Sequence, residues 1–322
     1  MTILLADIGG TNARFALWDE STGLNHLQIF KTADHPNFND AVAAYVASCA
    51  AQAKIDRAVI AVATAVTGDL IEFANSPWRF SRAAIAAQFG WNQLHVMNDF
   101  KAVALSVPHV PRDQLQSIGG GQPQPDQPIG VIGPGTGLGV GYLLPDGRGG
   151  WIANSGEGGH VTATPNTPRE WAVIEYLLTH KYQSHVSAER LVSGKGIENM
   201  YQAICAMDGY TPDAAIDAAQ ISRRGISGQC PICAEVMQIF CAMLGSVAGN
   251  LALTLGAHGG VYIAGGIPVK ILDYFKTSEF RARFEAKGRR REYMQSIPTY
   301  VITANNFAFL GLAAYGKSNL SR

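Results

Sequence analysis

Two glycine-rich turns, each set between apolar segments, constrain the fold of this 322-residue chain more than any other feature. Short apolar runs bounded by glycines predict buried strands joined as hairpins. Both regions have the order apolar run, turn, apolar run: residues 3–6, 7–12 and 13–18, then 129–132, 133–139 and 140–144. The two turns differ in sequence, so only the pattern repeats. We interpret it as one hairpin in each of two similar halves that face each other across a cleft.

The length of the chain predicts two domains, because single hydrophobic cores rarely grow beyond about 250–300 residues. The segment 119–128 is rich in glycine, proline and glutamine, so we expect neither a helix nor a central strand there. We interpret it as a loop near a domain boundary.

Apolar periodicity predicts further elements: helices over 38–53 and 83–89, strands over 58–63 and 94–97, and a turn at 67–69 from which 70–74 returns. Residues 236–269 contain no Asp, Glu, Lys or Arg, but several glycines interrupt them. A membrane span needs about 20 mostly apolar residues in a row. A buried helix, a glycine-rich turn and a buried strand over 261–264 explain this region better.

The charge balance excludes long-range attraction to nucleic acid, since 25 Lys and Arg face 25 Asp and Glu. The basic run from Lys287 to Arg291 is interpreted as a solvated helix end. The N-terminus lacks the basic region of a signal peptide. We therefore expect a cytoplasmic protein with no nucleic-acid partner and no membrane.

The five cysteines form an odd, sparse set that is typical of a reducing compartment. Cys230 and Cys233 make one CxxC pair ahead of a long apolar helix. Zinc would need two further ligands, and the sequence has no second CxxC. We interpret the pair as structural packing and predict no metal site there.

The two turns also suggest phosphate binding, because glycine lets backbone N–H groups approach a ligand closely. Gly9-Gly10-Thr11 and Gly135-Thr136-Gly137 each add a threonine hydroxyl as a further donor. Asp7 ends the first strand, where a carboxylate could hold Mg²⁺ through water. Neither a P-loop nor a GxGxxG motif is present. Each turn alone is explained as an ordinary tight turn; the two together favour a nucleotide cleft.

Three motifs make the resemblance specific. Residues 7–14 (DIGGTNAR) and 133–140 (GPGTGLGV) resemble the two phosphate motifs of bacterial glucokinases, and 264–267 (AGGI) resembles their adenosine motif. These enzymes belong to the sugar kinase, actin and heat-shock chaperone superfamily. The resemblance implies that ATP, bound with Mg²⁺, contacts this set of residues: Asp7, Ile8, Gly9, Gly10, Thr11, Asn12, Gly135, Thr136, Gly137, Gly265 and Gly266.

The resemblance also implies the fold, an α/β, two-domain actin-like ATPase (hexokinase-like) fold with a cleft between the domains. The motifs span almost the whole chain in the family's order. We expect a small domain of residues 1–110 plus 301–322 and a large domain of residues 111–300. The family is commonly dimeric, so a homodimer is expected.

A carboxylate beside the accepting hydroxyl is needed in a kinase of this kind, and Asp99 at the end of a buried strand is the candidate. Asn98 can donate and accept hydrogen bonds to sugar hydroxyls. From the residues alone, this pair is better explained as the cap of a helix that starts near Phe100. The resemblance implies that Asp99 is the catalytic base.

Two further segments supply polar groups for a sugar. Glu157 and His160 lie in the glycine-rich stretch 156–160, and Glu189 lies in 187–194. By themselves they are explained as a surface turn and as charge in the first turn of a helix. The resemblance implies that all three bind substrate, together with Asn98. The sequence lacks the multi-cysteine zinc motif of ROK sugar kinases, which argues against that type.

The function predicted is ATP-dependent phosphorylation of glucose at the 6-hydroxyl, giving glucose 6-phosphate and ADP, with Asp99 as general base. The alternatives are a kinase for another hexose, such as mannose or fructose, and a non-catalytic sugar-binding regulator on the same fold. A third alternative, an actin-like or chaperone-like ATPase, does not explain the polar residues in the cluster Gly156–His160.

Overall fold

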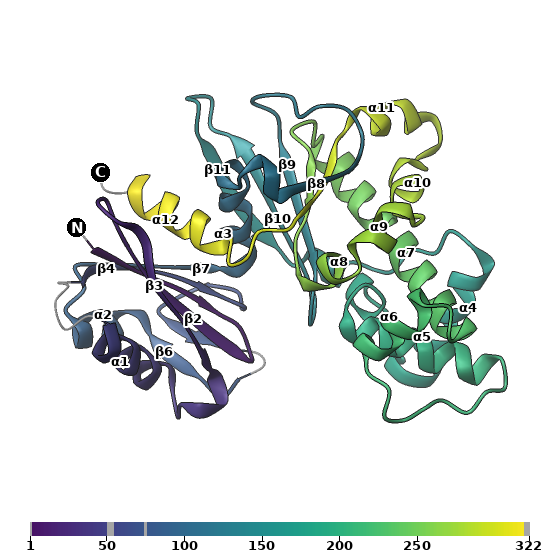
Figure 1. Ribbon diagram of the computed structural model, residues 1–322, viewed down its shortest axis with the longest axis horizontal. Coiled ribbons are helices and arrows are strands. Elements are labelled where there is room, and N and C mark those ends of the chain that lie inside the picture. The colour runs from purple at the N-terminus through teal and green to yellow at the C-terminus, as the bar shows by residue number, and fades with distance from the viewer. Residues whose placement is uncertain (1, 50–54, 74–75, 319–322) are drawn as a thin grey trace. The chain divides into compact units, whose positions relative to one another are not determined.

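The computed structural model describes residues 2–49, 55–73 and 76–318. The chain divides into two compact units. Unit 1 comprises Met1–Pro111, Ala153–Ser155 and Ala304–Arg322, and unit 2 comprises Arg112–Ile152 and Gly156–Thr303. Each unit has its own sheet and is described by itself (Figure 1).

The sheet of unit 1 has the strand order β3-β2-β1-β4-β7. Its members are β1 (Thr2–Ile8), β2 (Asn12–Asp19), β3 (Gly23–Lys31), β4 (Ile55–Val62) and β7 (Gln93–Asn98). Strands β1 and β2 pair antiparallel, which confirms the first predicted hairpin. Strands β1, β4 and β7 run parallel to one another.

Helices cover both faces of this sheet, and β1 is therefore buried on both sides. Leu4 and Ala6 of β1 pack with α1 (Phe38–Cys49) and α2 (Arg82–Phe89). Ile3 and Leu5, on the opposite face, pack with α3 (Asp99–Ser106) and α12 (Ala308–Ser318). Strands covered on both faces read as continuous apolar runs, as this one does.

Residues 70–74 were predicted to return from the turn at 67–69. This prediction is wrong, because the described part of this segment does not pair with the strand before the turn. Strand β5 (Leu70–Glu72) pairs antiparallel with β6 (Arg79–Ser81) in a separate two-stranded sheet. The reason is aromatic packing: Phe80 of β6 lies 4.4 Å from Phe38 of α1, ring centroid to ring centroid. Residue 74, and 50–53 of the helix predicted over 38–53, lie outside the described residues.

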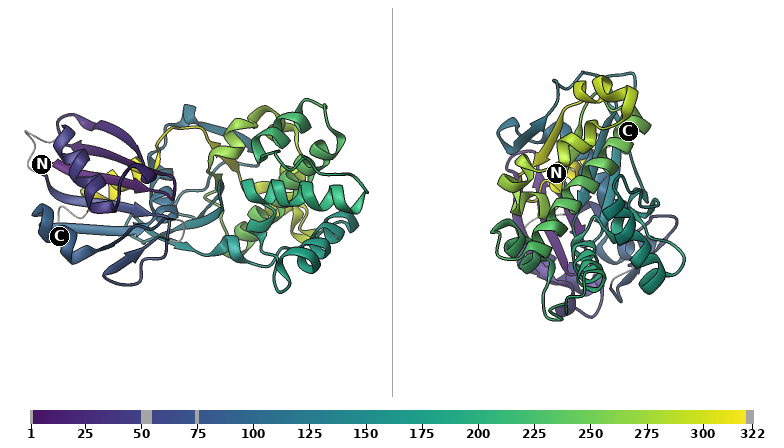
Figure 2. Two further views of the ribbon diagram at one scale, coloured as in Figure 1. Left: turned by 90° about the horizontal axis from the view of Figure 1, so that it is seen from below. Right: turned by 90° about the vertical axis from the view of Figure 1, so that its right-hand side faces the viewer.

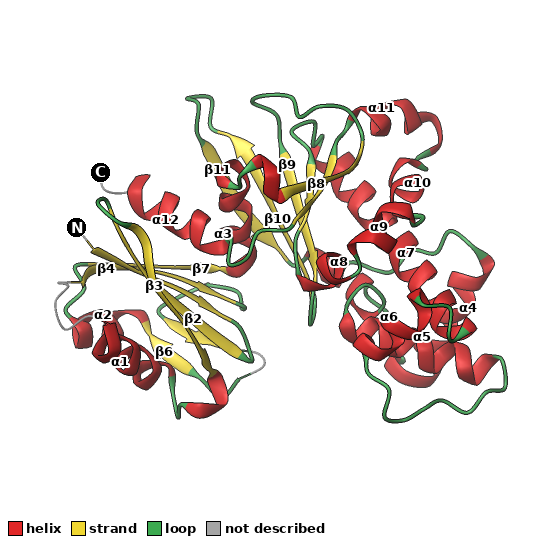
Figure 3. Ribbon diagram, viewed as in Figure 1, coloured by secondary structure: helices red, strands yellow, loops and turns green. Residues whose placement is uncertain are grey.

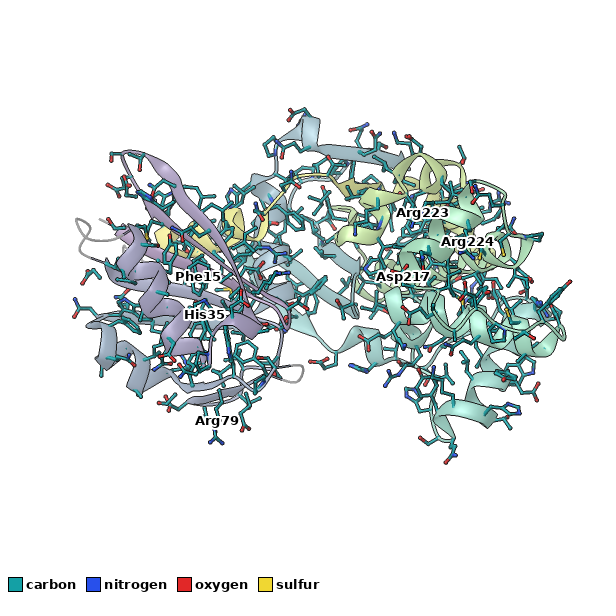
Figure 4. The ribbon with its side chains drawn as sticks, turned by 60° about the horizontal axis from the view of Figure 1, so that its bottom comes forward. Phe15, His35, Arg79, Asp217, Arg223 and Arg224 are labelled. Carbon is teal, nitrogen blue, oxygen red and sulfur yellow. The ribbon has the colours of Figure 1, made fainter. Side chains whose placement is uncertain are left out.

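Aromatic rings continue this core toward β3. Phe15 and His35, both labelled in Figure 4, each pack against the ring of Phe30. The Phe30 ring is 5.7 Å from Phe15 and is stacked 5.1 Å from His35. Such ring pairs add roughly 0.5–1.5 kcal/mol each beyond the area they bury.

The sheet of unit 2 has the strand order β11-β10-β9-β12-β13-β8. Its members are β8 (Leu115–Gly119), β9 (Ile129–Pro134), β10 (Leu138–Pro145), β11 (Trp151–Gly156), β12 (Val261–Ile263) and β13 (Thr299–Ile302). Strands β9, β12 and β13 are parallel, whereas β10 pairs antiparallel with β9. The second predicted hairpin is confirmed, with a shorter turn than expected.

Helices make up much of the rest of unit 2 (Figure 3). They are α4 (Pro168–Leu177), α5 (Gly194–Met207), α6 (Ala218–Ile226), α7 (Pro231–Leu255), α8 (Gly266–Lys270), α9 (Leu272–Thr277), α10 (Phe280–Glu285) and α11 (Arg291–Ser296). Short 3₁₀ turns are η1 (Thr32–Asp34), η2 (Val107–His109), η3 (Arg112–Gln114), η4 (Gly158–His160), η6 (Ala188–Arg190) and η7 (Gly288–Arg290), and η5 (Leu178–Tyr182) is a π turn.

Helix α6 shows how local sequence fixes helix ends. Asp217 and Gln220 form a capping box at its start, and Arg223 and Arg224 lie in its last turn. Three of these residues are labelled in Figure 4. Acceptors at the first turn and cations at the last both match the helix dipole.

Helix α7 is the apolar segment considered above for a membrane. Its length and composition alone would allow a span, but most of it is buried within the protein. It packs against α5, α6 and α10 in the core of unit 2, among the helices coloured teal to yellow-green in Figure 2. The predicted buried helix, turn and strand are therefore confirmed, with β12 as the strand.

The CxxC pair lies at the start of α7. Cys230 is the N-cap, and its sulfur accepts from the Cys233 N–H at 3.4 Å. Cys233 is buried in the core. Among the described residues, no group of three or more His, Cys, Asp or Glu could hold a metal ion. Cys230 thus caps α7, and Cys233 packs in the core.

A buried ion pair ties α4 to α10. Glu170 is 2% exposed, and its carboxylate accepts from both terminal nitrogens of Arg283, at 2.6 and 3.1 Å. The Asn166 N–H and the Ser246 hydroxyl complete the network. Because the pair is buried, removal of either charge would leave the other one uncompensated in the core.

We expect Glu170→Ala to lower the free energy of unfolding by about 3 kcal/mol, because it leaves the Arg283 guanidinium buried and uncompensated. Urea unfolding followed by circular dichroism measures the change. Glu198→Ala, which removes the exposed pair with Lys195, is the matched control and should cost under about 0.5 kcal/mol. Equal losses in the two variants would contradict this account.

Candidate functional site

Three strand ends meet at one edge of the unit 1 sheet. Ile8, Val62 and Asn98 are register neighbours across β1, β4 and β7. The Ala63 N–H donates to the Ile8 carbonyl at 3.1 Å, and the Asn98 amide donates to the Thr64 carbonyl at 3.3 Å. Ligands of open α/β sheets bind outside the carboxyl ends of the strands. The first glycine turn and the Asn98-Asp99 pair share that edge.

The first glycine turn is fixed from within and from β3. The Gly9 N–H donates to the Asn12 carbonyl at 2.9 Å. Thr32, just after β3, donates its N–H to the Thr11 carbonyl at 3.0 Å and its hydroxyl to the Gly10 carbonyl at 2.8 Å. Thr32 was missed by sequence reasoning, because a lone threonine 22 residues from Gly10 gives no local signal of this contact.

Asp7 lies beside Arg14, its register partner on β2. The Arg14 Nη1 is 3.0 Å from the Asp7 Oδ2, and the Asp7 side chain is 19% exposed. Burial raises the pKa of Asp7 above its ordinary value, and Arg14 opposes part of that shift. A carboxylate is a ligand that Mg²⁺ commonly uses in proteins, with the phosphates of a nucleotide as further ligands.

The helix-cap explanation of Asn98 is confirmed. Asn98 is the N-cap of α3, and its Oδ1 accepts from the Phe100 N–H at 2.9 Å. Asp99 is the first residue of that helix, and its Oδ1 also accepts from the Phe100 N–H, at 2.8 Å. The positive end of the helix dipole stabilises an ionised carboxylate at this position. Capping and carboxylate placement therefore come from the same two residues.

The adenosine motif and the second glycine turn meet in unit 2, where β9 and β12 end side by side. The Ala264 N–H donates to the Ile132 carbonyl at 2.8 Å. Gly265 has φ +89°, and a Cβ there would overlap the Pro134 carbonyl. Glycine is required at this position for both reasons. Gly266 then begins α8.

The second glycine turn is held by two segments. The Gly135 N–H donates to the Gly137 carbonyl across the turn at 2.8 Å. The Gly194 N–H donates to the Gly135 carbonyl, and the Leu138 N–H donates to the Glu189 Oε2, both at 2.8 Å. Sequence reasoning predicted Glu189 as a sugar ligand and missed this contact with the turn.

Glu157 and His160 lie on a 3₁₀ turn that rests on β10. The His160 N–H donates to the Glu157 carbonyl at 2.9 Å, and the side chains lie 3.8 Å apart, Nε2 to Oε2. Both side chains are mostly exposed, Glu157 by 70% and His160 by 58%. Between them, Gly158 and Gly159 face Val140 and Leu138 so closely that a Cβ on either would collide.

These contacts bring the predicted residues of unit 2 together at the start of β10. Leu138 touches Glu189 through its N–H and Gly159 through its carbonyl. The Ala188 N–H donates to the Val161 carbonyl at 2.8 Å, which joins the two loops. The structure therefore places Glu157, His160 and Glu189 around one strand end, beside the second glycine turn.

Gly159→Ala should lower the free energy of unfolding by about 3 kcal/mol, because its Cβ would overlap the Leu138 carbonyl. Gly156→Ala, at the end of β11 just before this turn, meets no atom within 4 Å and is the matched control. Thermal unfolding of both variants tests the prediction. If the two variants have the same unfolding temperature, the loop does not depend on this close approach.

Comparison with known proteins gives one consistent family. A family model described as Glucokinase matches residues 4–319. The glucokinase of Paramagnetospirillum magneticum is 47% identical over 316 residues, covering 97% of this chain and 96% of that protein. The glucokinase of Chromobacterium violaceum is 44% identical and covers 99% of this chain and 90% of that protein.

Solved structures agree. The crystal structure of a glucokinase from an Antarctic psychrotroph has a TM-score of 0.85 at 36% identity and covers 98% of each chain. A glucokinase from Balamuthia mandrillaris, in complex with glucose, has a TM-score of 0.80 at 22% identity, over 98% of this chain and 92% of that one. A ROK family glucokinase from Streptomyces griseus, with glucose and AMPPNP, has a TM-score of 0.62 at 17% identity, over 98% and 99%. The last two show the shared fold alone.

Proposed function

The chain belongs to the glucokinase family and phosphorylates glucose with ATP, and we propose that Asp99 is the general base of this reaction. The observation that carries the proposal is the position of Asp99. It follows β7 directly, at the strand edge that also holds the first glycine turn, and it begins α3.

In the proposed reaction, Asp99 accepts the proton of the glucose 6-hydroxyl while the oxygen of that hydroxyl bonds to the γ-phosphorus of ATP. The bond from that phosphorus to the bridging oxygen breaks, and ADP leaves. Little covalent chemistry falls to the protein, so positioning and charge stabilisation dominate. Asp99 lies in the first turn of α3, where the helix dipole favours a negative charge.

Glucose is proposed to bind through Asn98, Glu157, His160 and Glu189. Exposed carboxylate and imidazole groups are available to sugar hydroxyls, and Glu157 and His160 are exposed in this way. A hydroxyl that is missing or misplaced would leave a polar group unpaired, which is the usual source of sugar selectivity. The Balamuthia glucokinase, which shares this fold, was solved in complex with glucose.

The phosphates of ATP are proposed to bind at residues 8–12 and 135–137, and the nucleoside at Gly265 and Gly266. Both turns present glycine backbone, and Gly265 packs directly on the strand that leads into the second turn. Asp7 would hold Mg²⁺ together with the phosphates, where the ion supplies positive charge against the β- and γ-phosphates. The AMPPNP complex of the Streptomyces griseus protein supports a nucleotide site in this fold.

We also propose that the enzyme acts in the cytoplasm as a homodimer, as the family resemblance implies. Light scattering would test the second part, with a mass of twice the 34.4 kDa chain as the expected result.

Asp99→Asn should lower turnover by about 10²–10⁴-fold, because the amide cannot accept the proton. The KM for glucose should change little, since the amide still hydrogen-bonds a hydroxyl. ADP release in a coupled assay gives both constants, and circular dichroism checks the fold. Turnover within tenfold of the parent protein would remove Asp99 from the base role.

A panel of hexoses separates the alternatives. With ATP, we expect the highest kcat/KM for glucose and lower values for mannose and fructose. A preference for one of the others would make the protein a kinase for that sugar. Sugar binding without ADP release would indicate a regulator instead.

A further inference from the structure

We propose that Glu189, besides binding sugar, is a positioning residue for the nucleotide, and that Ser193 holds it in that double role. The inference rests on the proposed function of the second glycine turn, residues 135–137. Its test, however, uses nucleotide binding in the absence of sugar.

The first support is the contact between the Glu189 carboxylate and the turn. Its Oε2 accepts from the Leu138 N–H at 2.8 Å, at the residue that follows the turn. A Cβ on Gly137 would overlap the same oxygen, so the carboxylate lies directly against the turn. A side chain at position 137 would therefore displace the Glu189 carboxylate from the turn.

The second support is that both ends of the turn are held by the same short segment, residues 189–194. Glu189 holds the Leu138 end, and the Gly194 N–H holds the Gly135 carbonyl at 2.8 Å. Ser193 joins the two holding groups, since its hydroxyl donates to the Glu189 carbonyl at 2.7 Å. The same hydroxyl accepts from the Gly196 N–H at 3.0 Å as the N-cap of α5.

The segment is itself anchored in the core, which lets it act as a rigid support. Asn199 of α5 is fully buried, and its amide donates to the Arg190 carbonyl at 2.8 Å and to the Tyr182 hydroxyl at 2.9 Å. Its Oδ1 accepts from the Lys181 Nζ at 2.7 Å. The Arg190 guanidinium lies over the Tyr182 ring at 4.6 Å. Ser193 is also fully buried.

The arrangement has a consequence for binding. A carboxylate has two oxygens with several acceptor positions, so Glu189 can keep the Leu138 N–H while it accepts a sugar hydroxyl. In the described part of the chain, the printed bonds that hold the turn come from the N–H groups of Gly135, Leu138 and Gly194. The amides of Thr136 and Gly137 are the groups that we propose for phosphate. Sugar and nucleotide would then share one residue, and the affinity of each would depend on the other by the same factor.

Two variants at one position isolate the hydrogen bond to Leu138. Glu189→Gln and Glu189→Ala both remove the charge, but only the glutamine retains an oxygen that can accept from the Leu138 N–H. Calorimetric titration with Mg·ADP in the absence of sugar gives the Kd of each. We expect the alanine variant to bind ADP about tenfold more weakly than the glutamine variant. A difference below twofold would overturn the proposal, because a residue that only binds sugar predicts none.

Ser193→Ala tests the positioning role without touching either proposed ligand. We expect it to weaken both Mg·ADP and glucose by about three- to tenfold, because the Glu189 backbone and the α5 start lose their common partner. Thr167→Ala removes an equivalent N-cap, that of α4, and is the control for loss of helix stability. It should leave both affinities unchanged. If Ser193→Ala changes neither affinity, or if Thr167→Ala changes them equally, the positioning role is wrong.

The two proposals fail separately. Glucose phosphorylation by the unaltered protein tests the function, whereas the ratio of ADP affinities in the Glu189 pair tests the support of the turn. A normal rate with equal ADP affinities would remove only the positioning role.

Discussion

Parallel strand pairing is the constraint on which the rest of this structure depends. Hydrogen bonding in register aligns the ends of β1, β4 and β7 in unit 1, and of β9, β12 and β13 in unit 2. In each unit the loops that leave those ends must share one edge. Residues far apart in sequence, such as Asp7 and Asp99, come to the same edge for this reason. The helices on both faces of the unit 1 sheet keep that alignment buried and fixed.

Close approach of neighbouring segments is a second constraint on this structure. Gly159 lies against the Leu138 carbonyl, Gly265 against the Pro134 carbonyl, and Gly137 against the Glu189 carboxylate. None of the three could carry a side chain without moving its neighbour. These glycines therefore allow loops to pack closely on strands. Because glycine has no side chain, several loops can meet around one strand end.

Several residues combine a structural role with a chemical one. Asn98 caps α3 and thereby fixes the start of the helix on which Asp99 lies. Glu189 accepts from the Leu138 N–H and is also the residue that we propose for sugar binding. Such double use explains why the bare sequence supports a capping explanation and a functional one at once. The two explanations involve the same residues.

The sequence by itself determined the elements whose signals are local. Both hairpins, the buried helix α7 and the cap at Asn98 followed from apolar runs, glycines and capping residues within a few positions. Family membership, too, followed from short motifs at fixed spacings. These features need no knowledge of distant contacts, because turn conformation and burial patterns are set by neighbouring residues.

Only the tertiary structure decided the contacts between segments distant in sequence. The pairing of β5 with β6, the hold of Thr32 on the first turn and the contact of Glu189 with Leu138 are of this kind. In each case a side chain or strand has several possible partners of similar chemistry. Which partner it meets depends on the packing of whole helices and sheets, and no local pattern encodes that choice.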